Sequence, residues 1–119
     1  MNINERMAKV MGWVLIKAGE VFCGNLCVAD CYTDNSVFVM FKYDWHPDTS
    51  IEQALMCAEK AGANIQMYYS RSVGKWELCI NSLPCPVEYD EHEMMLRKYY
   101  TREELPLAIC NAILEAKDE

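Results

Sequence analysis

The sequence predicts an α+β fold, a layered α/β sandwich in which helices pack on a mainly antiparallel sheet. Two segments, 37–43 and 65–80, are rich in β-branched and aromatic residues, as is typical of strands. Two others, 51–61 and 105–116, repeat apolar residues at the spacing of a helix face. The 119 residues contain no long Gly/Ser/Pro linker and no internal repeat, so we expect one domain over residues 1–119, with about three helices.

The first element expected is a short helix. Asn4 is a suitable N-cap residue and Gly12 is a natural helix stop. Between them, Met7, Val10 and Met11 lie on one helical stripe.

Residues 13–43 have a β-like composition. Strands are expected at 14–16, 21–23 and 37–43. The polar cluster at 33–36 is typical of a turn and predicts a hairpin.

The clearest helix lies within residues 45–62. Side-chain oxygens between Pro47 and Ser50 can accept the N–H groups of its first turn, and Gly62 ends it. Its apolar stripe is expected to pack on a sheet and consists of Ile51, Leu55 and Ala58.

Two alternating runs, 65–69 and 75–80, predict an antiparallel hairpin around a turn at 70–74. Strand geometry would place Trp76, Leu78 and Ile80 on one face. An acidic, Met-rich segment at 88–100 then leads into a last helix, with Pro106 in its first turn. The buried stripe expected for that helix is Leu105, Ile109, Ala112, Ile113 and Ala116.

Four segments in this order resemble the phage ABA sandwich domain family: 7–13, 45–51, a strand centred on Trp76, and 105–112. The family comprises small phage and prophage proteins, and the resemblance implies a sandwich of helices and sheet and a phage origin. It brings no catalytic residues with it. Segments 21–43 and 88–100 depart from the family pattern, so a specialised activity is expected there.

The formal net charge is −7. This charge repels phosphate backbones and anionic lipid, so direct nucleic-acid binding and membrane binding are disfavoured. It suits either solubility or binding to the basic groove of a nucleic-acid enzyme. No apolar run is long enough to span a bilayer, and residues 1–6 lack the order of a signal peptide, so the expected location is the host-cell cytosol.

Seven cysteines occur, an odd number that fits a reducing compartment better than a disulfide framework. Cys23, Cys27 and Cys31 recur every four residues and would share one face of a helix, where they could begin a metal site. The second ligand pair would be Cys79 with Cys85 or His46 with His92, but neither pair has a characteristic spacing. Small buried core side chains are the alternative, and no metal or cofactor is predicted.

A metal- or thiol-dependent enzyme ranks third among the function classes, behind two classes of binding protein. The sequence has no phosphate-binding glycine loop, zinc motif or nucleophile elbow. Only His46 and His92 could serve as a histidine base, and both suit ordinary loop or surface positions.

Binding ranks ahead of catalysis. The leading hypothesis is an inhibitor of a host defence protein, in which acids and aromatic anchors contact the partner. A solvated charged segment is the alternative interpretation of the candidate residues, which are Glu88, Asp90, Glu91, Glu93, Tyr99 and Tyr100.

The second hypothesis is sequestration of a small nucleotide signal, with bases stacked on aromatic rings and a pocket completed by homo-oligomerisation. The residues that would hold the phosphates are Arg71, Lys75, Arg97 and Lys98.

Overall fold

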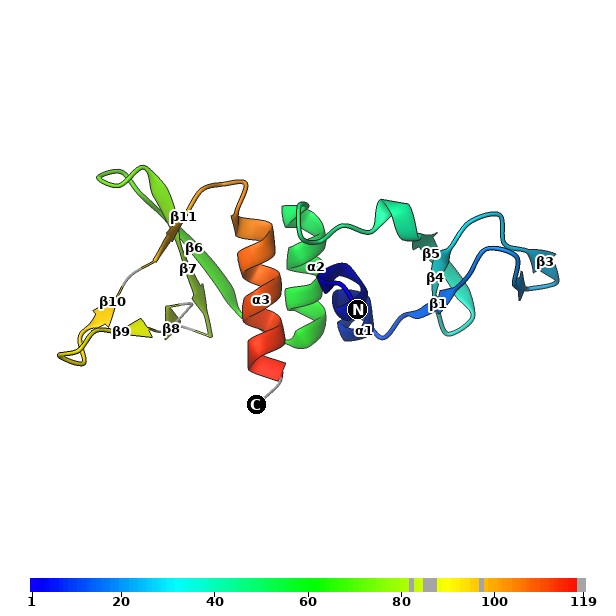
Figure 1. Cartoon of the computed structure of the whole chain (residues 1–119), viewed down its shortest axis with the longest axis horizontal. Coiled ribbons are helices and arrows are strands. Elements are labelled where there is room, and N and C mark those ends of the chain that lie inside the picture. Colours follow the sequence, from blue (N-terminus) through cyan, green and yellow to red (C-terminus); the bar gives the residue numbers. More distant parts are fainter. Residues whose placement is uncertain (82, 85–87, 97, 118–119) are drawn as a thin grey trace. The chain divides into compact units, whose positions relative to one another are not determined.

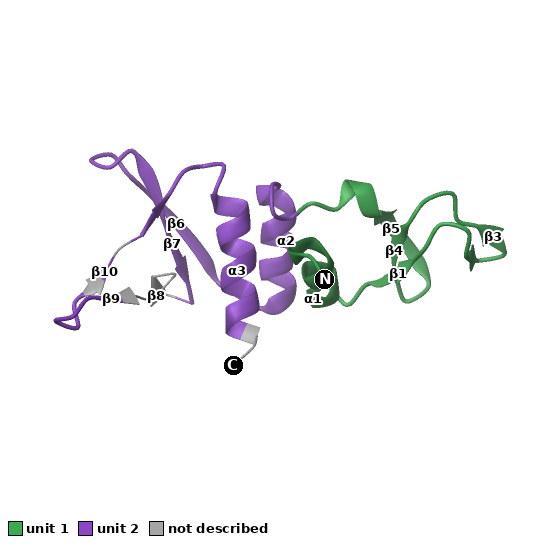
Figure 2. Cartoon of the chain, viewed as in Figure 1, with its two compact units in different colours: residues 1–46 green, residues 47–119 purple. Residues whose placement is uncertain are grey.

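The computed structural model describes residues 1–81, 83–84, 88–96 and 98–117. These residues form two compact units, 1–46 and 47–119 (Figure 2). Within them, three α-helices accompany small antiparallel sheets, so the predicted α+β class is confirmed. No helix in the described part of the chain is long and apolar enough to cross a membrane.

Unit 1 begins with a helix followed by short strands (Figure 1). Strands β1, β4 and β5 form a three-stranded antiparallel sheet, and β2 pairs with β3 as a separate hairpin. The element bounds are α1 (Ile3–Val10), β1 (Val14–Ile16), β2 (Val21–Phe22), β3 (Asn25–Leu26), β4 (Cys31–Asp34), β5 (Val37–Phe41) and the 3-10 helix η1 (Lys42–Asp44).

The first helix begins earlier than the sequence predicted. Asn2, not Asn4, is the N-cap, and its side chain accepts the N–H of Glu5 at 2.9 Å. The predicted turn is confirmed, because Asn35 and Ser36 both have positive φ between β4 and β5. Positive φ at both turn positions matches the twist of a two-residue hairpin.

The core of unit 1 is an aromatic cluster. The ring centroids of Trp13 and Trp45 lie 4.6 Å apart in an edge arrangement, and Tyr32 lies 6.0 Å from Trp13. Met7 and Ala8 of α1 are also buried, and Ala8 lines a small pocket together with Trp13 and Tyr32. Aromatic pairs of this geometry add to the energy of area burial, so unit 1 has its own apolar core.

Unit 2 contains two long helices and several antiparallel strands. Strands β11, β7 and β6 form one sheet, β8 pairs with β7, and β9 pairs with β10 separately. The bounds are α2 (Ile51–Ala61), β6 (Ile65–Ser70), β7 (Lys75–Ile80), β8 (Leu83–Pro84), β9 (Glu88–Tyr89), β10 (Met95–Leu96), β11 (Tyr99–Tyr100) and α3 (Leu105–Lys117).

The packing of α2 corrects the sequence prediction. Ser50 and Gly62 cap this helix as expected, but its main neighbour is α3 and not a sheet. Its buried face consists of Ala54, Cys57 and Ala58, while Leu55 is 36% exposed. Small side chains allow two helices to approach closely, so the helix contact selects the Ala/Cys face.

Helix α3 packs against both α2 and β7, and Figure 1 shows it between them. Pro106 lies in its first turn as predicted. Four predicted core residues, Leu105, Ile109, Ala112 and Ile113, are buried, but Ala116 is exposed, and Cys110 and Leu114 are also buried. The wider buried face follows from contacts on two sides of the helix.

The hairpin of β6 and β7 is confirmed, with Tyr69 opposite Trp76 and Ser70 opposite Lys75. The ring centroids of Tyr69 and Trp76 lie 5.3 Å apart at a steep angle. Leu78 is buried, but so is Cys79 on the opposite face, so both faces of this strand are covered at its centre.

Candidate functional site

The acidic segment folds into the hairpin of β9 and β10, which has Tyr89 opposite Met95. Asp90 builds its turn: the Asp90 Oδ1 accepts the N–H groups of His92 and Met94, each at 2.9 Å. The Asp90 N–H also donates to the Met94 carbonyl at 2.9 Å. Asp90 therefore stabilises the turn. Its Oδ1 is already engaged by two backbone N–H groups and is not free to bind a partner.

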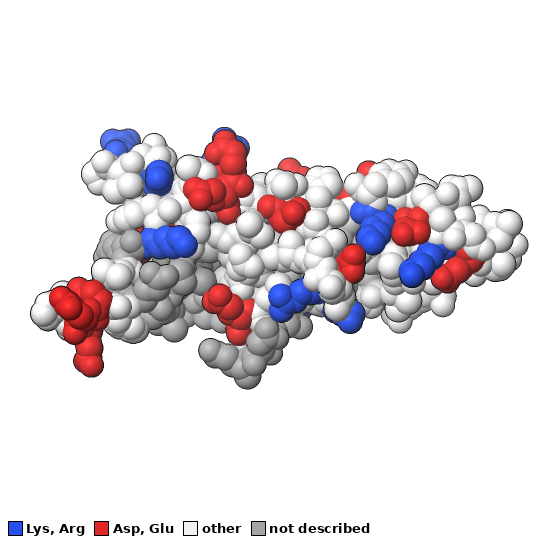
Figure 3. All heavy atoms as spheres, in the orientation of Figure 1, with Lys and Arg blue, Asp and Glu red and all other residues white. Residues whose placement is uncertain are grey.

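This turn presents an acidic and apolar surface. Glu91 and Glu93 are exposed, as are Tyr89 (59%), Met94 (64%) and Leu96 (44%). We call these five residues the hairpin surface. Acidic side chains gather at this tip (Figure 3). Glu91 and Glu93, which were predicted to bind a partner, thus lie on the same hairpin as exposed apolar side chains that were not among the predicted residues.

His92 lies at the same tip. Its Nε2 is 3.5 Å from the Glu91 Oε1, and both side chains are largely exposed. Such an exposed pair contributes little to stability, and the location suits the surface role expected for His92.

The other two predicted partner residues, Tyr99 and Tyr100, lie elsewhere in unit 2. They form β11, opposite Glu77 and Trp76 of β7. Tyr100 is buried, with the Lys98 ammonium 5.6 Å from its ring centroid, and Tyr99 is half-buried. The structure therefore separates this pair from the hairpin surface. Glu88 lies in β9, but its side chain is outside the described residues.

A groove of about 540 Å³ runs beside α3. We call it the α3 groove. Its lining includes four carboxylates, one ammonium and an apolar side chain, namely Asp48, Glu103, Glu104, Glu115, Lys98 and Leu107. The groove therefore favours a basic occupant over a phosphate.

Glu104 is held in the ionised form. Its carboxylate accepts the N–H of Thr101 at 2.8 Å, and this bond, then the Thr101 side chain, lowers the pKa of Glu104 below its ordinary value. The positive charges of Lys75 and Lys98 act in the same direction.

The predicted phosphate-binding residues are spread over different elements. Arg71 lies in the exposed turn between β6 and β7, and Lys75 begins β7. Lys98 lines the acidic α3 groove, and Arg97 lies outside the described residues. Among the described members of this set, Lys75 and Lys98 both act electrostatically on Glu104. The carboxylate of Glu104 is therefore an anion that already interacts with these two positive charges.

The regularly spaced cysteines do not lie on one helix, so that interpretation was wrong. Cys23 follows β2 with a positive φ, Cys27 follows β3, and Cys31 begins β4. Burial raises the pKa of the Cys31 thiol, and contact with Cys27 raises it further. The described residues contain no group of three His, Cys, Asp or Glu side chains that could hold a metal ion. His46 is exposed at the end of unit 1.

Comparison of the chain with protein-family models, with curated proteins and with solved structures found no match. The resemblance to the phage family stays a prediction from the sequence.

Proposed function

We propose that this chain is a phage accessory protein that binds a host defence protein through the hairpin surface and inhibits it. The observation that supports this proposal is the grouping of Glu91 and Glu93 with exposed Tyr89, Met94 and Leu96 on one hairpin. The sequence resemblance supports a phage origin and, through it, a host defence protein as the class of partner.

The two kinds of side chain have different tasks in such a complex. Tyrosine and methionine provide contact area that loses water on binding, and a few such anchors supply most of the affinity of an interface. Carboxylates steer a basic partner and reject acidic ones. A basic surface on the partner, such as the substrate groove of a nuclease, complements both Glu91 and Glu93.

The placement on a separate two-stranded hairpin also favours binding. The β9–β10 pair shares no strand with the β11–β7–β6 sheet in the described residues. A two-stranded hairpin is only marginally stable in water. A partner that contacts the hairpin surface would therefore add order as well as contacts.

The test is phage plating on host cells that carry a defence system, with the chain expressed from a plasmid. Wild type is expected to restore plaque formation on at least one strain of a defence panel. Glu91→Lys with Glu93→Lys should abolish the rescue. Glu52→Lys with Glu59→Lys is the matched control, since it makes the same charge change on exposed positions of α2, and it should keep the rescue.

Loss of rescue in both double variants would show that only net charge matters and would contradict the proposal. Absence of rescue by wild type across the panel would also contradict it. In that case, a nucleotide-dependent rise in the melting temperature Tm of the purified protein would favour the sequestration hypothesis with Arg71, Lys75, Arg97 and Lys98.

A further inference from the structure

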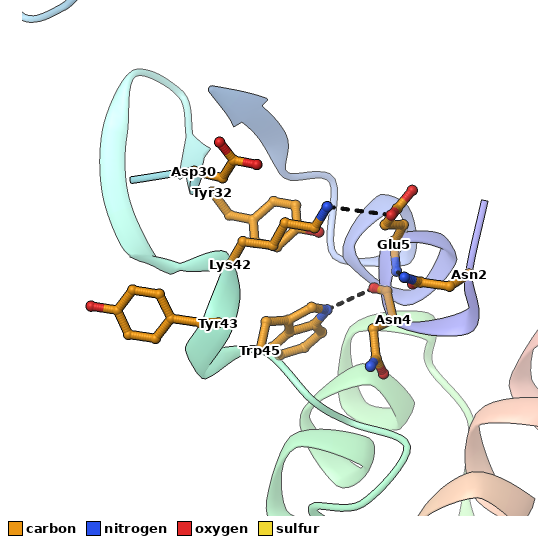
Figure 4. Close-up of a pocket in the computed structure, with 8 residues that line it drawn as sticks. All are labelled: Asn2, Asn4, Glu5, Asp30, Tyr32, Lys42, Tyr43 and Trp45. Atoms are coloured by element: carbon orange, nitrogen blue, oxygen red, sulfur yellow. Dashed lines mark hydrogen bonds and ion pairs between the residues drawn. The ribbon is translucent and has the colours of Figure 1, made fainter. Parts of the chain in front are cut away.

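Unit 1 contains a polar pocket with a volume of about 440 Å³ (Figure 4). Its walls come from α1, the segment that enters β4, and the chain from η1 to Trp45. Its lining includes Asn2, Glu5, Asp30, Tyr32, Lys42 and Trp45.

Tyr32 gives this pocket an unusual feature. The side chain is buried, with 3% of its surface exposed, and its hydroxyl has no hydrogen-bond partner among the described residues. Figure 4 shows the hydroxyl end directed toward α1, and the charges of Lys42, Glu5 and Asp30 all act on it. An unpaired buried hydroxyl destabilises the folded state, whereas a phenylalanine ring would fill the same space without that cost. Packing alone therefore gives no reason for the hydroxyl.

The side chains next to this hydroxyl can move apart. Lys42 Nζ and Glu5 Oε1 are 3.4 Å apart, and their side chains are 36% and 30% exposed. A partly solvated ion pair of this length is weak, so little free energy is needed to open it. Rearrangement of this pair would expose Tyr32 to a ligand.

The opposite wall is rigid. The Trp45 Nε1–H donates to the Asn4 carbonyl at 2.8 Å, and the Trp45 ring packs on Trp13. Asn2 is fixed as the N-cap of α1. The pocket thus combines a fixed wall with a cover that can open.

The lining carries both signs of charge. Lys42 and the Tyr32 hydroxyl can donate hydrogen bonds to an anionic group. Glu5 and Asp30 can accept from a cationic group, although one Asp30 oxygen already accepts the Ala18 N–H at 2.8 Å. A ligand with one charge would meet a like charge in this pocket, whereas a zwitterion pairs with both signs.

We propose that this pocket binds a small zwitterion of the α-amino-acid class. Its carboxylate is held by the Lys42 ammonium and the Tyr32 hydroxyl, and its ammonium is held by Glu5 and Asp30. The ligand supplies the hydrogen bond that Tyr32 lacks and replaces the exposed Lys42–Glu5 pair with two pairs. This proposal does not depend on the hairpin surface.

The first measurement is Tm of the whole chain with each proteinogenic amino acid at about 10 mM, followed by calorimetric titration of any that act. Propionate and propylamine are the single-charge controls. At least one amino acid should raise Tm by about 2 °C or more, because a ligand that binds only the folded state stabilises it. Neither control should do so.

The second measurement compares Tyr32→Phe with Tyr69→Phe, a control at an exposed tyrosine of unit 2. Tyr32→Phe should raise the ligand-free Tm by about 4 °C, since it removes an unpaired buried hydroxyl. It should also weaken the amino acid at least about tenfold, because one hydrogen bond to a charged group is lost. The control variant should change neither quantity.

Three results would overturn the proposal. The first is that no amino acid shifts Tm, and the second is that a single-charge control acts as strongly as the best amino acid. The third is a Tyr32→Phe variant that binds like wild type or that is less stable than wild type without ligand.

Discussion

At the residue scale, Cys57 and Cys110 show how burial controls chemistry. Both side chains are fully buried between α2 and α3, and burial raises the pKa of each thiol to about 12. The Cys110 Sγ also donates to the Pro47 carbonyl at 3.4 Å. The reactive species is the thiolate, so both residues should be inert in the folded protein.

Native alkylation with iodoacetamide at about pH 8, read by peptide mass spectrometry, checks this expectation. Cys23 is exposed and should be modified first. Cys57 and Cys110 should be modified only after denaturant is added. Equal rates at Cys23 and Cys57 under native conditions would show that the helix interface is open.

The same two pKa shifts predict a loss of stability in alkali. In the unfolded chain these thiols have the ordinary cysteine pKa of 9.0, whereas burial in the folded protein raises each pKa to about 12 and keeps the thiols protonated. Above pH 9 the unfolded state therefore releases protons first, and the free energy of unfolding falls as pH rises toward 12. Urea titrations across this range should show the fall, and a double Cys57→Ala, Cys110→Ala variant should show less of it.

Asp90 provides a third residue-scale prediction. Replacing it with alanine removes the acceptor for two N–H groups, so the turn of the hairpin should loosen at a cost of about 1 kcal/mol. Hydrogen exchange at the amides of His92 and Met94 should become faster in Asp90→Ala. Asp90→Asn keeps an Oδ1 acceptor and should exchange at the wild-type rate. Unchanged exchange in the alanine variant would contradict the assigned role.

At the element scale, the predicted and the observed buried faces of α2 differ: the sequence predicted a stripe that includes Leu55, and the structure buries Ala54, Cys57 and Ala58. Ala58 is buried on α2, whose main neighbour is α3, and Leu55 is partly exposed. Ala58→Leu should therefore overpack the contact and cost about 1–3 kcal/mol, whereas Leu55→Ala should cost less than about 1 kcal/mol. Urea unfolding measures both. If Leu55→Ala lowered the free energy of unfolding more than Ala58→Leu, Leu55 would belong to the buried face, as the sequence predicted.

Local patterns predicted the elements better than their packing. The strand at 14–16, the hairpin turns and the Ser50 and Gly62 caps depend on neighbouring residues, and the structure has them. The burial of Leu55 depends on which element α2 meets, and the spacing of apolar residues does not contain that information. Strand β4 was missed because Thr33 and Asp34 were assigned to the turn at 33–36, and because its pairing with β1 joins residues far apart in the chain, such as Val14 and Thr33.

At the scale of the whole molecule, the net charge suited either solubility or a basic partner, and it did not indicate where a partner would bind. The sequence grouped Glu88 to Tyr100 as one candidate segment. Folding divides it, because the turn places Glu91 and Glu93 at a hairpin tip while Tyr99 and Tyr100 join the β7 sheet. The exposed partners of the acids, Tyr89, Met94 and Leu96, could be identified only once their exposure was known.

The pocket in unit 1 could likewise not be predicted from the sequence. It unites α1, β4 and η1, which lie far apart in the chain. A lone tyrosine among aromatic and cysteine residues gives no sign that its hydroxyl lacks a partner.

The most direct test of the proposed binding surface is the dissociation constant Kd of a host protein captured by wild type, measured for wild type and for the two charge-reversed variants. Glu91→Lys with Glu93→Lys should raise Kd by at least about tenfold, and added salt should weaken wild-type binding more than binding of this variant. Glu52→Lys with Glu59→Lys should leave Kd within about twofold of wild type. Equal Kd values for wild type and the hairpin variant would contradict the account.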